Sequence, residues 1–211
     1  MFTGIIESIG TVKRITPKRN YIVLTVEHNL TSNDLNVGDS VACDGACLTV
    51  VSLGTNEFSF EISQETIACT IAEDYHDGTK INLERAVRVG DRLDGHFVTG
   101  HIDTVVTITK KKHIGESVFL ELQYDGKFDN LVVVKGSIAV NGVSLTVNDT
   151  SDGKCSVNLI PYTMTHTNFE QLSLNDRVNI EFDLIGKYAV QSATSKPNSN
   201  LTFPKLTESG W

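Results

Sequence analysis

The chain has 211 residues, a formal net charge of −8, an ordinary hydrophobic content of 40% and four cysteines. A surface this acidic repels phosphate backbones and anionic lipid, so we expect neither nucleic-acid nor membrane partners. There is no apolar run of about 18 residues, no signal-peptide pattern and no Cys-x-x-Cys pair, which together predict a cytoplasmic protein with reduced thiols.

Short runs of β-branched and apolar residues, separated by turn residues, predict strands along the whole chain. In the first half these runs are residues 21–26, 40–42, 48–51, 58–62 and 81–83. Asp44-Gly45 here and Asn141-Gly142 at the equivalent position of the second half are the strongest hairpin signals in the chain. A short helix is expected after Ser63, whose hydroxyl can cap it. In the second half, residues 118–122 and the partners of the earlier runs predict strands again. A second helix is expected from about Leu184 to Ser195, before Pro197.

The second half of the chain repeats the first at a spacing of 97 residues, which is the size of a small domain. Residues 40–50, SVACDGACLTV, align with residues 137–147, SIAVNGVSLTV. Residues 58–70 and 78–84 align in the same way with residues 155–167 and 175–181. About six strands per copy predict a closed antiparallel barrel or a sandwich. We divide the chain into residues 1–96, residues 97–186, and a C-terminal helix and tail of residues 187–211.

Common catalytic signatures are absent from the sequence, which has no dinucleotide-binding, Walker or nucleophile-elbow motif. Two histidines remain as candidates, His96 and His101, and each follows a glycine. A spacing of five places them on opposite faces of a strand, so they do not suit a shared metal. Two such histidines are more often structural, but the glycines before them would let a ligand approach the backbone.

The duplication adds a second set of candidates. Each copy carries Gly-x-[Cys/Ser]-Leu-Thr-Val after its tight turn, with Cys47 in the first copy matched by Ser144 in the second. Ile5 is likewise matched by His101. A preserved framework with altered reactive groups is consistent with two similar ligands in different chemical roles. It is equally consistent with a plain strand in which the cysteine-to-serine exchange is packing drift.

Several motifs, in this order, resemble those of the riboflavin synthases. They are MFTGI at residues 1–5, GACLTV at 45–50, INLER at 81–85, GHFVTGHID at 95–103, GVSLTV at 142–147 and VNIEFD at 178–183. The resemblance covers residues 1 to about 190. It implies an all-β fold of two similar six-stranded antiparallel Greek-key barrels, followed by a short C-terminal helix. The implied reaction transfers a four-carbon unit between two molecules of 6,7-dimethyl-8-ribityllumazine, giving riboflavin and a ribitylaminopyrimidinedione.

The resemblance also implies a homotrimer, in which the first barrel of one subunit meets the second barrel of another. No cofactor or metal is implied, because one substrate molecule gains what the other loses. The resemblance leaves open whether the protein associates with a lumazine synthase. Its implied catalytic residues are Cys47 as nucleophile or positioning group, His101 as base beside Ser144 and Thr146, and Asp183 and His96 as orienting groups.

Ligand contacts implied by the resemblance fall on both copies. In the first barrel they are Phe2, Gly4, Ile5, Ile6, Ser40, Cys47, Leu48, Thr49, Glu61, Ile62, Ser63, Gln64, Glu65 and Thr66. In the second barrel they are Gly100, His101, Ile102, Ser144, Leu145, Thr146, Asn158, Leu159, Ile160, Pro161, Tyr162 and Thr163. Lys135 is expected to reach the site of a neighbouring subunit.

Three features depart from the family pattern. Asp94 stands where a glycine is usual, Tyr162 stands where a carboxylate or histidine is frequent, and the tail contains Pro197 and Pro204. The alternative function is a non-catalytic carrier of lumazine or flavin, similar to the light-emitting accessory proteins related to this family. Such carriers look to have lost parts of the histidine stretch and of the Cys/Ser pair, both of which this chain retains.

Overall fold

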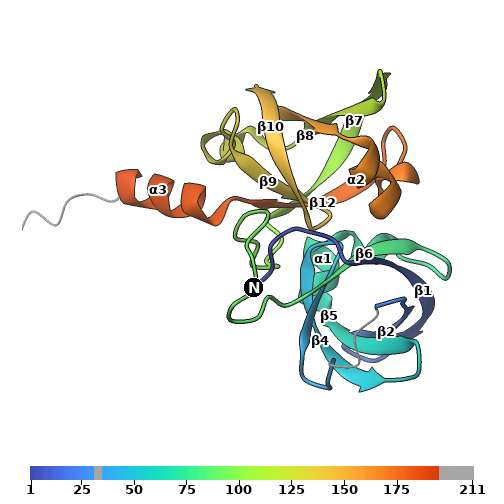
Figure 1. Ribbon diagram of the computed structural model, residues 1–211. Helices are drawn as coiled ribbons and strands as arrows, with labels where there is room; N and C mark the ends of the chain where they lie inside the picture. Colours follow the sequence, from blue (N-terminus) through green and yellow to red (C-terminus); the bar gives the residue numbers. More distant parts are fainter. Residues whose placement is uncertain (31–34, 195–211) are drawn as a thin grey trace, which may run out of the picture.

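Strands are the main regular elements of the computed structural model, which describes residues 1–30 and 35–194. They form two closed six-stranded antiparallel barrels, and these lie one beside the other with the N-terminal segment between them (Figure 1). Each barrel has its own hydrophobic core, and a third, smaller cluster of buried residues joins the two. The duplicated all-β architecture predicted from the repeat is therefore confirmed.

The first barrel has the strand order β1-β2-β5-β4-β3-β6, in which β2 to β5 and β3 to β6 are the non-sequential neighbours of a Greek key. Its elements are β1 (Ser8–Pro17), β2 (Tyr21–Glu27), β3 (Ser40–Cys43), β4 (Ala46–Leu53), β5 (Glu57–Ser63), α1 (Gln64–Cys69), the 3-10 turn η1 (Ile71–Asp74) and β6 (Lys80–Arg85).

The second barrel repeats this topology, with the order β10-β11-β8-β7-β12-β9. Its elements are β7 (Thr104–Ile114), β8 (Ser117–Gln123), η2 (Gly126–Leu131), β9 (Ser137–Val140), β10 (Val143–Ser151), β11 (Lys154–Leu159), α2 (Pro161–His166), η3 (Asn168–Glu170) and β12 (Arg177–Phe182). A final helix, α3 (Leu184–Thr194), follows β12 directly.

The five strand predictions in the first copy match β2 to β6, with ends that differ by one or two residues. The long strand β1 was not predicted, because Lys13, Arg14 and Pro17 interrupt its apolar pattern. A register shift between Val12 and Arg14 disturbs the alternation further, as a bulge does. In the second copy β7 was missed for the same reason, since it contains three consecutive lysines and a shift after Ile108.

Both hairpin signals occupy the tight turns between paired strands. Asp44 and Gly45 both have positive φ, at 44° and 82°, and Asn141 and Gly142 repeat these values at 45° and 78°. The two turns meet, so that a Cβ built on Gly45 would lie 2.7 Å from the backbone nitrogen of Gly142. Only glycine can stand at both positions, and the contact brings the two barrels together at equivalent points.

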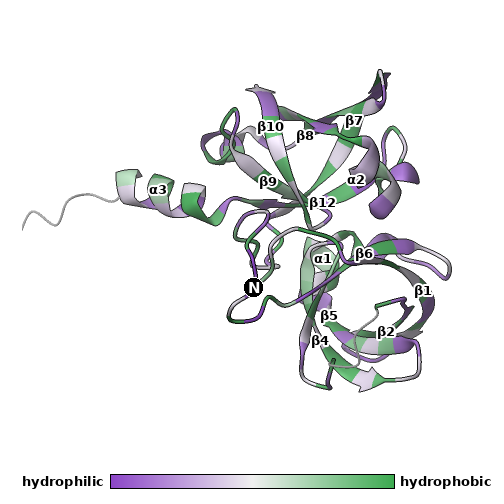
Figure 2. Ribbon diagram, in the orientation of Figure 1, coloured by the Kyte–Doolittle hydropathy of each residue, from purple (hydrophilic) through white to green (hydrophobic). Residues whose placement is uncertain are grey.

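The two predicted helices, α1 and α3, are present, whereas α2 was not predicted. Ser63 caps α1, where its Oγ accepts a hydrogen bond from the backbone N–H of Thr66. Helix α3 begins at Leu184, projects away from both barrels in Figure 1 and alternates apolar and polar residues in Figure 2. The tail after residue 194, including Pro197 and Pro204, lies outside the described residues. Among the residues described, no helix has the length and apolar character needed to cross a membrane.

Candidate functional site

The junction between the barrels is built around the first residues of the chain. Phe2 is fully buried and pairs with Val98 as an isolated antiparallel bridge, with hydrogen bonds in both directions. Phe2, Ala42, Val98 and Ala139 form the small apolar cluster that joins the two cores. Phe2 was predicted to contact ligand, but its side chain packs inside this cluster and so contributes to the junction itself.

Two glycine-containing segments cross from one barrel to the other. The carbonyl of Gly4 accepts a hydrogen bond from the N–H of Ser144 at 2.8 Å, and the carbonyl of Gly100 accepts one from the N–H of Cys47 at 2.9 Å. The repeat groups Gly4 with Cys47 and Gly100 with Ser144, each within its own copy. That grouping is wrong, because residues 4–6 lie against β10 and residues 100–102 lie against β4.

The second barrel's surface contains the closest pair of candidate catalytic groups. His96 Nδ1 lies 2.7 Å from Ser144 Oγ, and the backbone N–H of His96 donates to the carbonyl of Thr3. Burial lowers the pKa of His96, while the nearby carboxylates of Asp183 and Glu181 partly oppose that shift. The imidazole is therefore neutral at pH 7 and can act as a hydrogen-bond acceptor or base.

We expected His101, rather than His96, beside Ser144. Within one chain His101 is exposed and its segment faces the first barrel, so the imidazole that contacts Ser144 is that of His96. His96 Nε2 is buried and has no hydrogen-bond partner among the described residues. An unpaired buried nitrogen is costly, and a bound ligand would offer it a partner.

The first barrel presents an outward surface made by β4, β5 and α1. Cys47 is half-buried and Thr49 is exposed on β4, and Thr49 pairs with Ser40 of β3. Val50 pairs with Phe60, which makes Thr49 and the exposed Glu61 neighbours on the outer face. The helix residues Gln64 and Glu65 are exposed beside them.

The second barrel presents the equivalent surface on β10, β11 and α2. Thr146 and Asn158 are exposed at the positions of Thr49 and Glu61, and Ile160 and Tyr162 are exposed at the start of α2. The ring of Tyr162 stacks on His166 with centroids 3.9 Å apart, so an aromatic residue of the chain already covers one face of it.

Four of the predicted ligand contacts face the wrong way for their side chains to reach these surfaces. The side chains of Leu48, Ile62, Leu145 and Leu159 are buried in the barrel cores, because alternate residues of a strand point to opposite faces. Their predicted role is restricted to the backbone. Lys135, by contrast, is exposed with φ at 65°, where the first copy has Gly38.

Asp183 links the second surface to α3. Its Oδ1 accepts from the N–H of Ile185, as a helix-capping carboxylate does, and its charge acts on His96. Lys187 in the first turns of α3 forms an ion pair with Asp103 at 2.6 Å. The start of α3 is thus fixed to the second barrel even though the rest of the helix projects outward.

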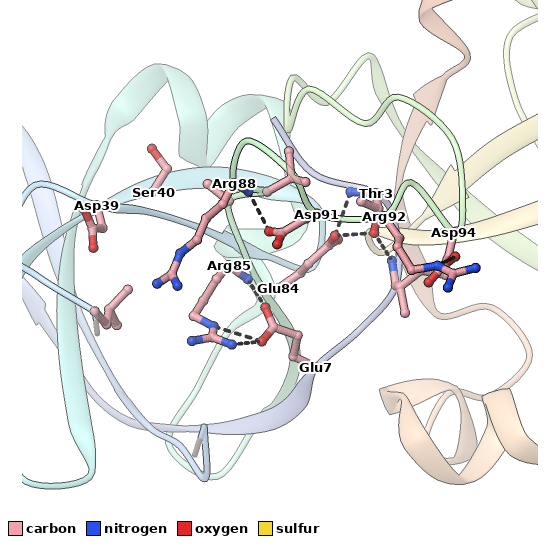
Figure 3. Close-up of a pocket in the computed structure, with 14 residues that line it drawn as sticks. Thr3, Glu7, Asp39, Ser40, Glu84, Arg85, Arg88, Asp91, Arg92 and Asp94 are labelled. Carbon is pink, nitrogen blue, oxygen red and sulfur yellow. Dashed lines mark hydrogen bonds and ion pairs between the residues drawn. The ribbon is translucent and has the colours of Figure 1, made fainter. Parts of the chain in front are cut away.

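A cleft of about 510 Å³ lies beside the first barrel, between Ser40 and the segment that connects the barrels. Its lining includes Thr3, Ile5 and the ion pair between Glu7 and Arg85, and Figure 3 shows that pair together with Thr3 and Ser40. Two of the predicted contacts, Ile5 and Ser40, therefore line a hollow. Within the described ranges, no three His, Cys, Asp or Glu side chains are grouped as a metal site requires.

Glu84 and Glu181 are site residues that the motif search did not single out. Both are almost fully buried on the last strand of their barrels, and each holds the glycine segment that precedes its barrel. The signal was present in the repeat, because Asn-x-Glu recurs at residues 82–84 and 179–181. In an alternating strand a charged residue is expected to face outward, so the pattern alone does not indicate that these two are buried.

Comparison with known proteins agrees with this geometry. The family model described as "Lumazine binding domain" matches residues 3–86 and again residues 99–183. The riboflavin synthase of Bacillus subtilis is 38% identical over 99% of this chain and 96% of its own length. That of Schizosaccharomyces pombe is 37% identical over 89% of this chain and 91% of its own. Among solved structures, LumP complexed with riboflavin has a TM-score of 0.78 at 24% identity, over 86% of this chain and 99% of LumP.

The two matched barrels, each with an outward polar surface, define a protein with tandem lumazine-binding domains. The likeness to LumP concerns the fold alone at this level of identity. The riboflavin synthases of two bacteria and a fungus, by contrast, are 35% to 38% identical to this chain over 89% or more of its length, which shows the family. The chain belongs to the riboflavin synthase family.

Proposed function

We propose that this protein catalyses riboflavin synthesis, the dismutation of two molecules of 6,7-dimethyl-8-ribityllumazine. A four-carbon unit leaves one molecule and joins the other, giving riboflavin and 5-amino-6-(ribitylamino)pyrimidinedione. The atoms balance between two identical substrates, so the reaction needs no external oxidant, reductant or group donor. Family membership over nearly the whole chain supports the reaction, and the paired barrels supply one surface for each substrate molecule.

The observation that carries the proposal is the chemical difference between two surfaces that are otherwise equivalent. The first offers the thiol of Cys47, and the second offers the hydrogen-bonded pair of His96 and Ser144. A dismutation needs two like binding sites that treat like molecules differently, one as donor and one as acceptor. A carrier of a single ligand has no need of that difference.

Roles follow from residue type and position. The neutral His96, through Ser144, is suited to accept the proton that the acceptor's C7 methyl group must lose. Cys47 is suited to attack or position the donor, and Asp183 to orient the imidazole through its charge. His101 is assigned to the first surface, next to Cys47, because its segment crosses to that barrel. Much of the rate acceleration would come from holding two pterins together in the correct orientation.

A homotrimer completes the proposal. In one chain both surfaces are open, since Thr49, Glu61, Thr146 and Tyr162 are all exposed. Closing them on one another, the first surface of one subunit against the second of the next, would exclude water from the reacting rings. Lys135 would then reach the neighbouring subunit's site. The exposed α3 is the element we assign to holding the subunits together.

The test is conversion by the purified protein with no cofactor added. We expect riboflavin and the pyrimidinedione in equal amounts from the lumazine substrate, with the same rate after treatment with EDTA. Tight binding of lumazine without conversion would instead make the protein a carrier, and a rate restored only by a divalent ion would refute the metal-free mechanism. Sedimentation equilibrium measures the oligomeric state independently of either result.

A further inference from the structure

Two buried glutamates hold the crossing segments in place. Glu84 on β6 accepts hydrogen bonds from the N–H and hydroxyl of Thr3, at 2.6 and 2.8 Å, and from the N–H of Gly4 at 3.0 Å. Glu181 on β12 makes the same three contacts with Thr99 and Gly100, at 2.7, 2.7 and 2.8 Å. Their exposed fractions are only 4% and 2%. Both oxygens of each carboxylate therefore accept hydrogen bonds from one short segment.

Each clamped segment then reaches the opposite barrel. The carbonyl of Gly4 accepts from Ser144, and that of Thr3 accepts from the N–H of His96 at 3.0 Å. The carbonyl of Gly100 accepts from Cys47. The approach is so close that a Cβ built on Gly4 would lie 2.6 Å from that of Ser144, and one on Gly100 would overlap that of Cys47. A shift of either segment must therefore move the reactive side chain beneath it.

We propose that Glu84 and Glu181 are positioning residues that act across the junction. Glu84, in the first barrel, sets the geometry of His96 and Ser144 on the second barrel's surface. Glu181, in the second barrel, sets Cys47 and the neighbouring His101 on the first. The relevance of this arrangement to riboflavin synthesis rests on the function proposed above, whereas the arrangement itself can be tested without substrate.

A purely local role would give the reverse pattern. Ala42 pairs with both Glu84 and Cys47, and Ala139 pairs with both Glu181 and Ser144. If each glutamate only supported its own sheet, a change at Glu84 would disturb Cys47 first. The crossed and local roles therefore predict effects on different reactive groups.

The experiment uses Glu84→Gln and Glu181→Gln in the full chain. A glutamine keeps the size of the side chain but turns one acceptor into a donor facing an N–H, which breaks the clamp. In a Cys69→Ser background, Cys47 is the remaining thiol that is not buried. Glu181→Gln is expected to raise its alkylation rate by iodoacetamide about threefold or more, because the thiol gains access, while Glu84→Gln leaves the rate within about twofold.

The matching measurement follows the His96 imidazole by NMR titration. Glu84→Gln is expected to raise the pKa of His96 towards its ordinary value, since a loosened segment admits water to the ring. Glu181→Gln is expected to lower it or leave it unchanged, because a negative charge close to His96 is removed. A rise in this pKa is therefore expected only in Glu84→Gln.

Thr3→Val and Thr99→Val provide gentler variants, each removing one hydroxyl from a clamp, and should give the same pattern of alkylation with smaller changes. Greater alkylation in Glu84→Gln than in Glu181→Gln would overturn the proposal, as would unchanged alkylation and titration in all four variants. If the crossed pattern appears in a protein that does not convert the lumazine, the proposed function fails and the positioning role stands. In an active protein, we expect each glutamine variant to lower kcat about tenfold or more with a smaller change in KM.

Discussion

The two barrels share a framework of backbone contacts but differ in the side chains that face the junction. Asn82 and Asn179 make matching bonds, each donating its amide to the carbonyl of residue 141 or 44 in the other barrel. Asp44 and Asn141 also occupy matching turns, and each accepts from the N–H of the asparagine in its own barrel. The groups that hold backbone in place are thus duplicated faithfully.

The two copies differ in the side chains that contact the residues of these turns. Asp44 is held by the hydroxyl of Tyr75 and the amide of Asn168. At the matching positions the second turn has Leu172 and Ile71, which offer no side-chain hydrogen bond, and the Nδ2 of Asn141 is buried without a partner among the residues described. The difference teaches that duplication kept the positions of the two outward surfaces while their surroundings diverged chemically.

Removing one barrel would break the comparison most completely. We expect residues 1–97 to fold and to bind lumazine or riboflavin, because they carry one whole surface, but to lose turnover because they lack Ser144. Loss of Val98 and Ala139 uncovers Phe2, which should lower stability by about 2 kcal/mol. Circular dichroism, ligand fluorescence and a turnover assay provide the measurements. Turnover near that of the full chain would show that one surface suffices and that the two surfaces do not have different chemical roles.

A single substitution, His96→Gln, tests the asymmetry at the second surface. We expect kcat to fall about 100-fold or more, as for loss of a general base. Because burial lowers the pKa of His96, the wild-type rate should hold down to a pH below 6.5 and decline only as the ring gains a proton. The exposed His113→Gln on β7 serves as control. A pH profile unchanged in His96→Gln would assign the proton transfer to another group.

Exchange of Cys47 and Ser144 asks whether the two surfaces are interchangeable. Cys47→Ser and Ser144→Cys should each lower turnover about tenfold with less effect on ligand affinity, since both frameworks survive. The double exchange should not restore the rate, because His96 contacts position 144 alone. Steady-state rates and fluorescence titration of the three variants decide the matter. Wild-type rates in the double exchange would reduce both positions to packing residues.

The smallest effect is expected from Asp44→Asn, which makes the two turns alike. Burial raises the pKa of Asp44 to about 7, against the opposing hydrogen bonds from Asn82, Tyr75 and Asn168. The folded form then keeps a proton that the unfolded chain loses near pH 4, so wild-type stability should fall as pH rises from about 4 to 7, by at most about 1.4 kcal/mol per pH unit.

In Asp44→Asn this pH dependence should disappear, while exposed Asp149→Asn should retain it. Thermal melts at several pH values measure both. Parallel pH profiles for wild type and Asp44→Asn would mean that Asp44 is ionised throughout and that its hydrogen bonds outweigh its burial.

Much of the fold could be predicted because repetition is visible in sequence. The aligned turns at Asp44-Gly45 and Asn141-Gly142 gave both the strand order near the junction and the equivalence of the barrels. Strand β1 was not predicted, because its charged residues and its bulge obscure the alternation of apolar and polar residues. Leu48 and Thr49 were both predicted to contact ligand. They are adjacent on a strand and so face opposite sides, Leu48 towards the core and Thr49 outward.

The crossing of segments could not be predicted, since similarity aligns Gly4 with Gly100 and says nothing about which barrel each one contacts. For the same reason His101 was predicted beside Ser144, where the structure places His96. His96 and His101 are five residues apart, and both suit a base by residue type. Their separation onto different barrels depends on Thr3 accepting the N–H of His96, a contact between residues more than 90 positions apart.

The crossing also bears on the order in which the molecule forms during its synthesis on the ribosome. Residues 2–4 are synthesised before their clamp, Glu84, which follows within the same barrel. Their remaining partners, Val98 and Ser144, do not yet exist when the first barrel can close. In a nascent first barrel, residues 2–4 are therefore bound to Glu84 on one side. On the other side their backbone groups stay unpaired until the second half of the chain is made. Translation speed between residues 85 and 144 sets how long these groups stay open to pairing with another chain.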